Sequence, residues 1–490
     1  MSSQRLRSWL PRISALSRYP GKTNGRRGRP RTLNARLAVE RCEDRTVPST
    51  SIPLNAQTWT SIGPSPINLG QSPGNPSSTG RVNGIAVDSV NSNLMFAATD
   101  AGGLWRTTDG GKTWSPRTDQ LQMQFQTIAS VHRTPGDTVY VFDQTGKLYT
   151  STDSATTFTV TQPFGSAEAG AVVNKLVVMP TDPNDQTKDI LYAAVGDVTA
   201  QEPSAFPMKP PVKGSGIWLS TDGGKTWKNL IDSTKLPFTT NSATPIPADS
   251  LSFSDVATDP TNPNIVYAAV GNEHVDPTNG IYRTLNALSA TPTWTLLTGG
   301  SQFVPGESPG VIKIAVAPNL PSEIFASFTV GALTGVDGPD PLLGIFRSLD
   351  TGSTWSPMLL TNPGAPVTSL ANYLGTTGYD NDVLAISPTS PASPDKQIVY
   401  VAGFGAANFG FLNTVLGSPD GGNSWFLDGT DSNGVGPYPN VHQAAFDSQG
   451  RLVLATGGGI YRLTDTPTTF QWDSLNGMPG PNALNVVDFN

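Results

Sequence analysis

One eight-residue pattern recurs along the chain and constrains its fold more than any other feature. The string STDGGKTW stands at 220–227, TTDGGKTW at 107–114, SLDTGSTW at 348–355 and SPDGGNSW at 418–425. A pattern that recurs at intervals of tens of residues indicates a repeat architecture, in which each copy forms one supersecondary unit. The residues around each string therefore decide the fold.

Each string closes a longer repeat. Upstream lie three short apolar runs separated by turn residues, as in GRVNGIAVD, NLMFAAT and GLWRT before the string at 107–114. The closing aromatics of the repeats are Trp114, Phe158, Trp227, Trp294, Trp355, Trp425 and Trp472. The aromatic opens a fourth strand, so we predict seven repeats of four antiparallel strands. Four-stranded sheets repeated radially form a β-propeller. The predicted fold is all-β, a single propeller of about seven blades over residues 51–490.

Composition agrees with this fold and divides the chain. With 50 Gly, 43 Pro and only 14% charged residues, the sequence is rich in turns. Residues 1–50 carry 12 of the 31 Lys and Arg, so we predict a disordered basic leader in front of an acidic body. An acidic body disfavours nucleic-acid binding. The single cysteine, Cys42, allows no internal disulfide, and no apolar run is long enough to span a membrane.

The end of the leader resembles an export motif. Residues 36–50, RLAVERCEDRTVPST, are similar to a short N-terminal motif of planctomycete proteins that are thought to be exported, with Cys42 in place of the usual Leu. This resemblance implies a secreted or cell-surface protein. The alternative is a basic leader that carries no targeting signal.

The repeats also resemble a known superfamily. The strings look like the Asp-boxes of bacterial neuraminidase repeats, and the unit at 80–114 is similar to repeats of sialidase-like and sortilin-type β-propellers. The resemblance covers about residues 57–490. It implies the propeller fold and leaves the function open.

The chemistry of the boxes favours a structural role over a binding site. The aspartate can accept backbone N–H bonds within the turn, the glycines supply positive φ, and the tryptophan fills space beside the neighbouring sheet. The residues predicted to act in this way are Asp109, Trp114, Ser220, Asp222, Gly224, Thr226, Trp227, Ser348, Asp350, Gly352, Trp355, Ser418, Asp420, Gly422 and Trp425.

Binding is expected on the opposite face. In an antiparallel blade, the turns between strands one and two and between strands three and four share one face. The long insertions fall between strands two and three, at 196–215, 271–280, 331–344 and 403–417. Long loops gathered on one face of a rigid scaffold are where binding residues concentrate. We therefore predict the ligand site among these four loops.

Two carboxylates on that face are candidate catalysts. Asp100, in TDAGG, resembles a catalytic aspartate of two-propeller xyloglucanases, and Asp197 occupies a comparable place in repeat three. Paired carboxylates suit glycoside hydrolysis, one as acid and one as base. The alternative is that both are turn carboxylates. A sialidase is disfavoured because Arg106, Arg283 and Arg347 repeat one blade position, as Arg462 also does, instead of converging on one clamp.

Metal and cofactor chemistry is expected to be absent. His132, His274 and His442 fall in three different repeats, which disfavours zinc. The segment 429–434, GTDSNG, keeps part of a calcium loop but lacks its first acid and its distant glutamate, so a plain turn is favoured. The sequence carries no phosphate-binding Gly-Lys loop.

The predicted function is an extracellular or surface module that binds glycans or proteins. A glycoside hydrolase is the alternative, and an assembly factor for another complex fits the same fold. The oligomeric state is open. Ring closure is also open, because an eighth, partial blade competes with seven. We predict that Trp59, Val486 and Val487 lie at the seam of a seven-bladed ring.

Overall fold

The computed structural model describes most of the predicted propeller. The described residues are 72–74, 76–118, 124–164, 172–196, 214–231, 251–271, 278–297, 309–331, 341–360, 373–375, 378–405, 414–465, 470–477 and 484. The chain divides into two units, Met1–Leu54 and Asn55–Asn490, and every described residue belongs to the second. The leader, its export motif and its predicted end at residue 50 lie outside the described residues and stay predictions.

The described residues form seven four-stranded sheets, each antiparallel and built from four strands consecutive in the chain. Blade 1 holds β1 (Val82–Val87), β2 (Met95–Thr99), β3 (Leu104–Thr107) and β4 (Ser115–Pro116). Blade 2 holds β5 (Phe125–Val131), β6 (Thr138–Asp143), β7 (Leu148–Ser151) and β8 (Thr159–Thr161). Blade 3 holds β9 (Val173–Met179), β10 (Ile190–Val195), β11 (Gly216–Ser220) and β12 (Lys228–Ile231). Blade 4 holds β13 (Phe253–Asp259), β14 (Asn262–Val270), β15 (Gly280–Thr284) and β16 (Trp294–Leu296).

The remaining blades repeat this order. Blade 5 holds β17 (Pro309–Val316), β18 (Ile324–Val330), β19 (Leu342–Ser348) and β20 (Ser356–Met358). Blade 6 holds β21 (Val383–Ile386), β22 (Val399–Ala402), β23 (Val415–Ser418) and β24 (Phe426–Leu427). Blade 7 holds β25 (Val441–Phe446), β26 (Leu452–Thr456), β27 (Gly459–Asp465) and β28 (Phe470–Ser474). Helical structure in this part of the chain is limited to α1 (Gly378–Asn381) and two 3-10 turns, Gln186–Lys188 and Pro394–Lys396. None of these is long and apolar enough to cross a membrane.

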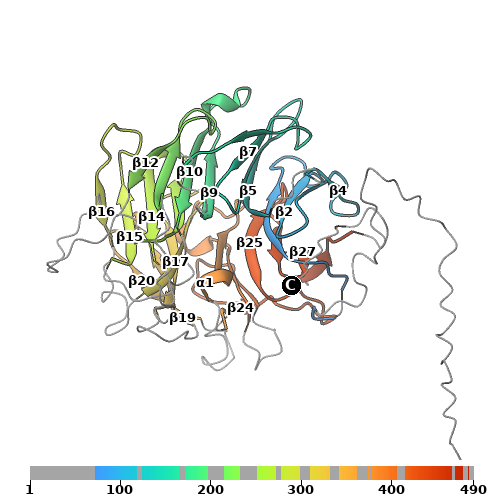
Figure 1. The fold of residues 1–490 in the computed structure, drawn as a ribbon. Helices are drawn as coiled ribbons and strands as arrows, with labels where there is room; N and C mark the ends of the chain where they lie inside the picture. Colours follow the sequence, from blue (N-terminus) through green and yellow to red (C-terminus); the bar gives the residue numbers. More distant parts are fainter. Residues whose placement is uncertain are drawn as a thin grey trace, which may run out of the picture. The chain divides into compact units, whose positions relative to one another are not determined.

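The first strand of each blade is the innermost one. These strands contact one another in the order β1, β5, β9, β13, β17, β21, β25 and back to β1, which closes a ring. Figure 1 shows the closure, with the orange and red strands of blade 7 beside the blue strands of blade 1. The predicted all-β propeller of seven four-stranded blades is confirmed.

The hydrophobic core lies between the blades. Each cluster of buried apolar residues combines side chains of two neighbouring blades. Every closing aromatic belongs to a cluster with the blade before it. Trp425, for example, is fully buried with Phe325 and Leu360 of blade 5. The repeat folds in this way because a single twisted sheet cannot bury both of its faces alone.

Blades 1 and 7 meet as the other neighbours do. Trp114 packs with Leu475 and Val453 of blade 7, and its indole N–H donates to the carbonyl of Leu475 at 2.7 Å. Leu484 is buried in the same cluster, and its carbonyl accepts from Thr79 Oγ1 at 2.9 Å. Part of the C-terminal segment therefore lies at the seam. Trp59, Val486 and Val487 lie outside the described residues, so the predictions for them stay open.

Candidate functional site

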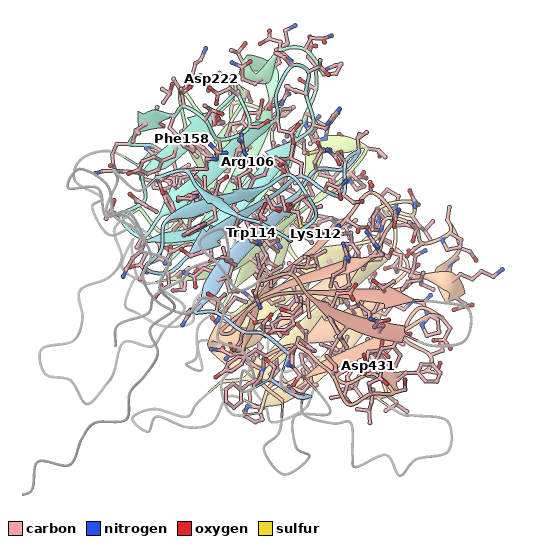
Figure 2. The ribbon with its side chains drawn as sticks, turned by 90° about the vertical axis from the view of Figure 1, so that its right-hand side faces the viewer. Arg106, Lys112, Trp114, Phe158, Asp222 and Asp431 are labelled. Carbon is pink, nitrogen blue, oxygen red and sulfur yellow. The ribbon has the colours of Figure 1, made fainter. Side chains whose placement is uncertain are left out.

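The four repeated strings, at 107–114, 220–227, 348–355 and 418–425, form tight turns between the third and fourth strands, and so do residues 151–158; we call all of these the box turns. In the turn at 220–227, Ser220 Oγ donates to Asp222 Oδ1 at 2.8 Å and accepts from Gly224 N at 2.9 Å. Thr226 donates twice to the same carboxylate, from its N to Oδ1 at 2.9 Å and from its Oγ1 to Oδ2 at 2.6 Å. Figure 2 shows Asp222 on its turn. The equivalent bonds recur around Asp109, Asp350 and Asp420.

The sequence placed Phe158 among the closing aromatics, but Ser151, Asp153 and Thr157 were not identified from it as box residues. In blade 2, Ser151 Oγ donates to Asp153 Oδ1 at 2.7 Å, and Thr157 Oγ1 donates to Oδ2 at 2.7 Å. The string STDSATTF has the serine, aspartate and threonine in place, but it lacks the glycines and the tryptophan. Matching those three polar positions alone, with any aromatic at the end, would have found it. Blade 4 keeps a looser version in which Asn286 accepts from Thr284 Oγ1 and Thr293 N, each at 2.9 Å.

Hydrogen bonding inside the box turns favours the ionised carboxylate. Burial raises the pKa of Asp222, but the bonds from Thr226 and Ser220 lower it more, so the net shift is downward. The same balance lowers the pKa of Asp153 to about 2. A carboxylate that is held ionised by its own turn does not donate a proton, and the box turns therefore offer no general acid.

The strand-three arginines do not converge on one point. Arg106 Nη1 donates to the carbonyl of Ser154 in the next blade, at 2.8 Å, and Arg283 Nη1 donates to that of Thr351 at 2.6 Å. Arg347 Nε pairs with Glu323 at 2.7 Å. Figure 2 shows Arg106 in blade 1, one of the blades over which these side chains are spread. Arg347 also reaches Asp395 of blade 6 at 3.2 Å, whereas Arg462 pairs with Asp473 of its own blade at 3.3 Å. These arginines therefore bond within or between neighbouring blades and do not form a clamp around one ligand.

Several predicted site residues fall outside the described part of the chain. They are Asp197, His274 and most of the four long loops, namely 197–213, 272–277, 332–340 and 406–413. The prediction that these loops bind the ligand stays open.

The innermost strands surround a central cavity of about 580 Å³, to which all seven blades contribute. Its polar lining includes Arg81, Asn83, Asp100, Gln126, Gln144, Asn174, Lys175, Asp255, Lys313, Asp382, His442 and Gln443. Many of these residues stand near the starts of the innermost strands. Asp100 follows β2, where the chain passes to strand three, so it lies at the end of blade 1 on which the long loops were predicted.

A β-bulge recurs near the start of the innermost strands. The register shifts by one residue between Val82 and Gly84, and at matching places in blades 2, 3, 4 and 7. The residues skipped are Asn83, Gln126, Asn174, Ser254 and His442. A bulge redirects a side chain from its strand, and here each bulged residue is polar. Asn83 Nδ2 donates to the carbonyl of Phe125, and Asn174 Nδ2 to that of Phe253, so the bulges also link successive blades.

Asp100 is held at the cavity by two amide side chains. Asn83 Nδ2 and Gln144 Nε2 both donate to its Oδ1, at 3.2 and 3.3 Å. Its Oδ2 accepts no hydrogen bond within the described ranges. Gln126 Oε1, in the lining of the same cavity, is a buried acceptor that also lacks a partner there. The cavity therefore presents unused acceptors to a ligand.

The other two lining carboxylates are fully engaged. Asp255 accepts from the backbone N of Val256 at 2.9 Å and from that of Ile314 at 2.8 Å. Asp382 is 4% exposed and accepts from Ser327 Oγ at 2.6 Å and Tyr373 Oη at 2.7 Å. Burial raises the pKa of Asp382 to about 6. Among the described lining residues, Asp100 alone offers a carboxylate oxygen without a partner.

The segment compared with a calcium loop is a turn that joins blades. Asp431 Oδ1 accepts from Asn433 N at 2.8 Å and Val435 N at 3.0 Å, and its Oδ2 accepts from Trp472 N at 3.3 Å. Both oxygens are used by backbone amides. Figure 2 shows Asp431 in blade 7's part of the ring, well away from Asp222.

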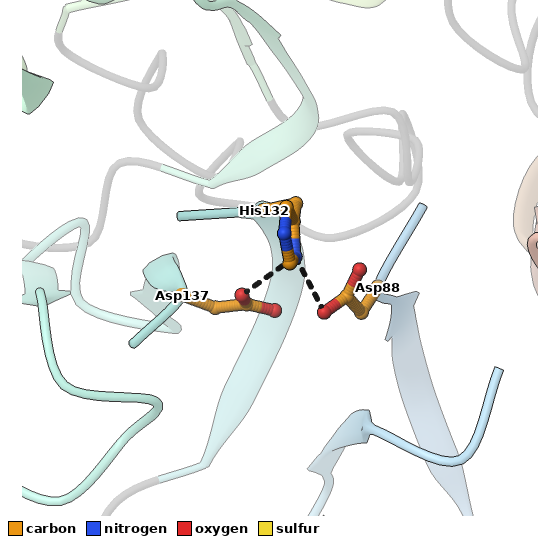
Figure 3. Close-up of side chains that lie close together, drawn as sticks. All are labelled: Asp88, His132 and Asp137. Carbon is orange, nitrogen blue, oxygen red and sulfur yellow. Dashed lines mark hydrogen bonds and ion pairs between the residues drawn. The ribbon is translucent and has the colours of Figure 1, made fainter. Parts of the chain in front are cut away.

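One grouping of possible metal ligands was not foreseen. His132 lies with Asp88 and Asp137, from two neighbouring blades, and one ligand atom of each falls within 4.8 Å of the others (Figure 3). The three histidines fall in different repeats, and Asp88 lies 44 residues before His132, so no local sequence pattern reveals this grouping. The predicted absence of a metal site thus stays untested.

Comparisons with known proteins agree with the fold. The sequence model of the Sortilin-Vps10 family, described as sortilin, neurotensin receptor 3, matches residues 102–270. A xyloglucanase from Paenibacillus sp. is 25% identical over 348 residues, which cover 61% of this chain and 30% of that protein. The family match and the seven-bladed ring support a sortilin-type propeller superfamily.

Solved structures agree with the fold. The GH74 xyloglucanase from Xanthomonas campestris superposes with a TM-score of 0.51 at 15% identity, over 85% of this chain and 56% of that one. An ancestral GH74 enzyme superposes with a TM-score of 0.54 at 16% identity, over 84% and 48% of the two chains. At these identities the likeness shows the fold alone. The chain spans less than a third of the xyloglucanase relative and about half of each solved enzyme.

Proposed function

We propose that the propeller is a binding module that takes a glycan at the central cavity. The observation that carries this proposal is the pair of unused acceptors, Asp100 Oδ2 and Gln126 Oε1, among a ring of amide side chains. Amide side chains donate to and accept from hydroxyl groups, and an ionised carboxylate accepts from them, which suits a sugar. In this proposal the box turns are structural and take no ligand.

The charges in the cavity favour a neutral polar ligand. Its described lining includes three basic residues, Arg81, Lys175 and Lys313, and three acidic ones, Asp100, Asp255 and Asp382. A balanced lining gives no strong attraction to a polyanion such as a nucleic acid. A glycan meets such a surface through hydrogen bonds, which do not depend on net charge.

Glycoside hydrolysis is the second candidate, favoured by the similarity to a xyloglucanase. In that case Asp100 acts as one of two carboxylates, which stand roughly 5–10 Å apart in glycosidases. Asp255 and Asp382 use both oxygens in hydrogen bonds with the protein, and Asp197 is not described. Binding needs no second carboxylate, so it is the function that the described residues support best. The resemblance of residues 36–50 to an export motif supports a place outside the cell for either activity.

A glycan array with a hydrolysis assay on every bound glycan tests both functions. We expect selective binding without released sugar, weakened roughly tenfold or more in Asp100→Asn, since a hydrogen bond to a charged group contributes about 1.5–3 kcal/mol. Asp109→Asn, the same change on a box turn, should bind as the unaltered protein does.

Two results would separate the candidates. Sugar release that Asp100→Asn abolishes would replace the binding module by the hydrolase. Binding that Asp109→Asn weakens as much as Asp100→Asn, or an array without any bound glycan, would contradict the site.

A further inference from the structure

A second cluster of ionisable side chains lies where blades 1 and 2 turn from their first strand to their second. Asp88 directly follows β1, His132 directly follows β5, and Asp137 directly precedes β6. Figure 3 shows the three side chains pointing toward one another across the boundary between the blades. This is the end of the blades that also carries the box turns, so the cluster is separate from Asp100.

Backbone amides fix both carboxylates. Asp88 Oδ1 accepts from Val90 N at 2.7 Å and Asn91 N at 3.1 Å, which leaves Oδ2 to face His132 Nδ1 at 2.9 Å. Asp137 Oδ1 accepts from Arg133 N at 3.3 Å and lies 3.5 Å from the same Nδ1. Supporting hydrogen bonds of this kind orient ligands in metal sites.

One oxygen in the cluster lacks a partner. The side chain of Asp137 is 2% exposed, and its Oδ2 is buried without a hydrogen bond. Figure 3 shows this carboxylate directed into the gap between His132 and Asp88. A buried carboxylate oxygen without a donor is costly, and a bound cation removes that cost.

The charges of the cluster also favour a bound cation. Asp88 and Asp137 together bring two negative charges, and His132 supplies at most one positive charge. The guanidinium of neighbouring Arg133 is directed elsewhere, to Asp189 at 2.6 Å. Within the described ranges, no other cation pairs with Asp88 or Asp137. A divalent cation beside a neutral imidazole would balance the two carboxylates.

We propose that Asp88, His132 and Asp137 form a Zn²⁺ site that joins blade 1 to blade 2. Ligand atoms on a tetrahedral Zn²⁺ with bonds of about 2.0–2.1 Å stand roughly 3.3 Å apart. His132 Nδ1 lies 2.9 Å from Asp88 Oδ2 and 3.5 Å from Asp137 Oδ1, and one ligand atom of each residue falls within 4.8 Å of the others. One imidazole and two carboxylates make a three-ligand set. The side chain of His132 is 38% exposed, so solvent can reach the cluster and supply water as the fourth ligand. Ca²⁺ fits less well because it takes six to eight oxygens.

Zinc titration of the untagged full chain, stripped with a chelator, tests the site. We expect one Zn²⁺ per chain with a melting temperature that rises by several degrees, since a ligand that binds only the folded state stabilises it. In His132→Gln and Asp137→Asn the Kd should rise at least tenfold and the thermal shift should disappear. His442→Gln is the matched control, and it should bind Zn²⁺ as the unaltered protein does.

Asp137→Asn also separates a metal site from an ordinary ion pair. In chelator, removal of one of two facing negative charges should leave this variant at least as stable as the unaltered protein. In saturating Zn²⁺ the order should reverse. The absence of bound Zn²⁺, equal binding in His132→Gln, or a loss of stability in Asp137→Asn that is the same with and without metal would overturn the proposal.

Discussion

Asp153, on the outer box turn of blade 2, and Asp382, at the inner edge of blade 6, each accept a hydrogen bond from two hydroxyl groups. Ser151 and Thr157 bond the first, and Ser327 and Tyr373 bond the second. Their pKa values nevertheless move in opposite directions. For Asp153, burial raises the pKa but the hydrogen bonds outweigh it, and the pKa falls to about 2; for Asp382, burial prevails and the pKa rises to about 6.

The difference lies in backbone donors and solvent. Asp153 also accepts from the backbone N–H groups of Thr156 and Thr157, and it remains partly exposed. Asp382 is 4% exposed, and its partners are side chains of β18 and of residue 373. The box turns, which we call the rim, therefore keep their aspartates ionised through hydrogen bonds within one turn. The residues that line the central cavity, which we call the axis, come from several blades, and there burial determines the pKa of Asp382.

The largest expected effect tests whether the rim is structural. Trp425→Ala should lower the free energy of unfolding by about 3–5 kcal/mol, because it empties a fully buried indole site between blades 5 and 6. Chemical denaturation measures this change. Phe426→Ala, at a 42% exposed neighbour, is the control and should have little effect. Equal losses in the free energy of unfolding of the two variants would contradict a structural role for the closing tryptophan of the box turn.

A smaller effect tests the backbone of the box turn. Gly224 has φ of +85°, and an added Cβ would lie 2.6 Å from Leu148 Cδ2. Gly224→Ala should therefore cost about 1–2 kcal/mol through left-handed strain, with the close contact adding to it. Gly434→Ala isolates the strain, because φ is +75° there and nothing lies within 4 Å of the added atom. If both variants lost the same free energy of unfolding, the contact between the added Cβ and Leu148 would contribute nothing, because the Leu148 side chain would move away.

The sequence predicts the box turns better than the central cavity, because the box turns are formed by residues close together in the chain. The box turns are local, so a string such as STDGGKTW carries all of their hydrogen-bonding residues, and the seven blades followed from it. The repeat that ends at Phe158 was predicted, but Asp153 was not assigned to a box turn because its string has Ala155, with a φ of 61°, where the other turns have glycine. At the axis, Asp382 meets Ser327 from another repeat. Such pairs depend on the ring's closure and register, which no local string encodes.

The last test compares the sign of the pH dependence of stability between the box turns and the central cavity. Asp382 has a folded pKa of about 6, above its unfolded value near 3.8, so the folded protein holds the extra proton between these values. Stability therefore falls as pH rises through this window. Asp382→Asn removes this penalty, and its stability relative to the unaltered protein should improve from pH 4 to pH 6 and stay level above pH 7.

Asp153→Asn should show the opposite slope at lower pH. Its folded pKa of about 2 lies below the unfolded value, so the carboxylate stabilises the fold above pH 4 and loses this contribution as pH falls toward 2. The variant's disadvantage should shrink over that interval. Asn is sterically suited to the position, as Asn286 shows in blade 4. Denaturation of both variants across pH 2–8 measures the slopes. If they had the same sign, burial would not distinguish the axial carboxylate from the rim, and the contrast between the two regions would fail.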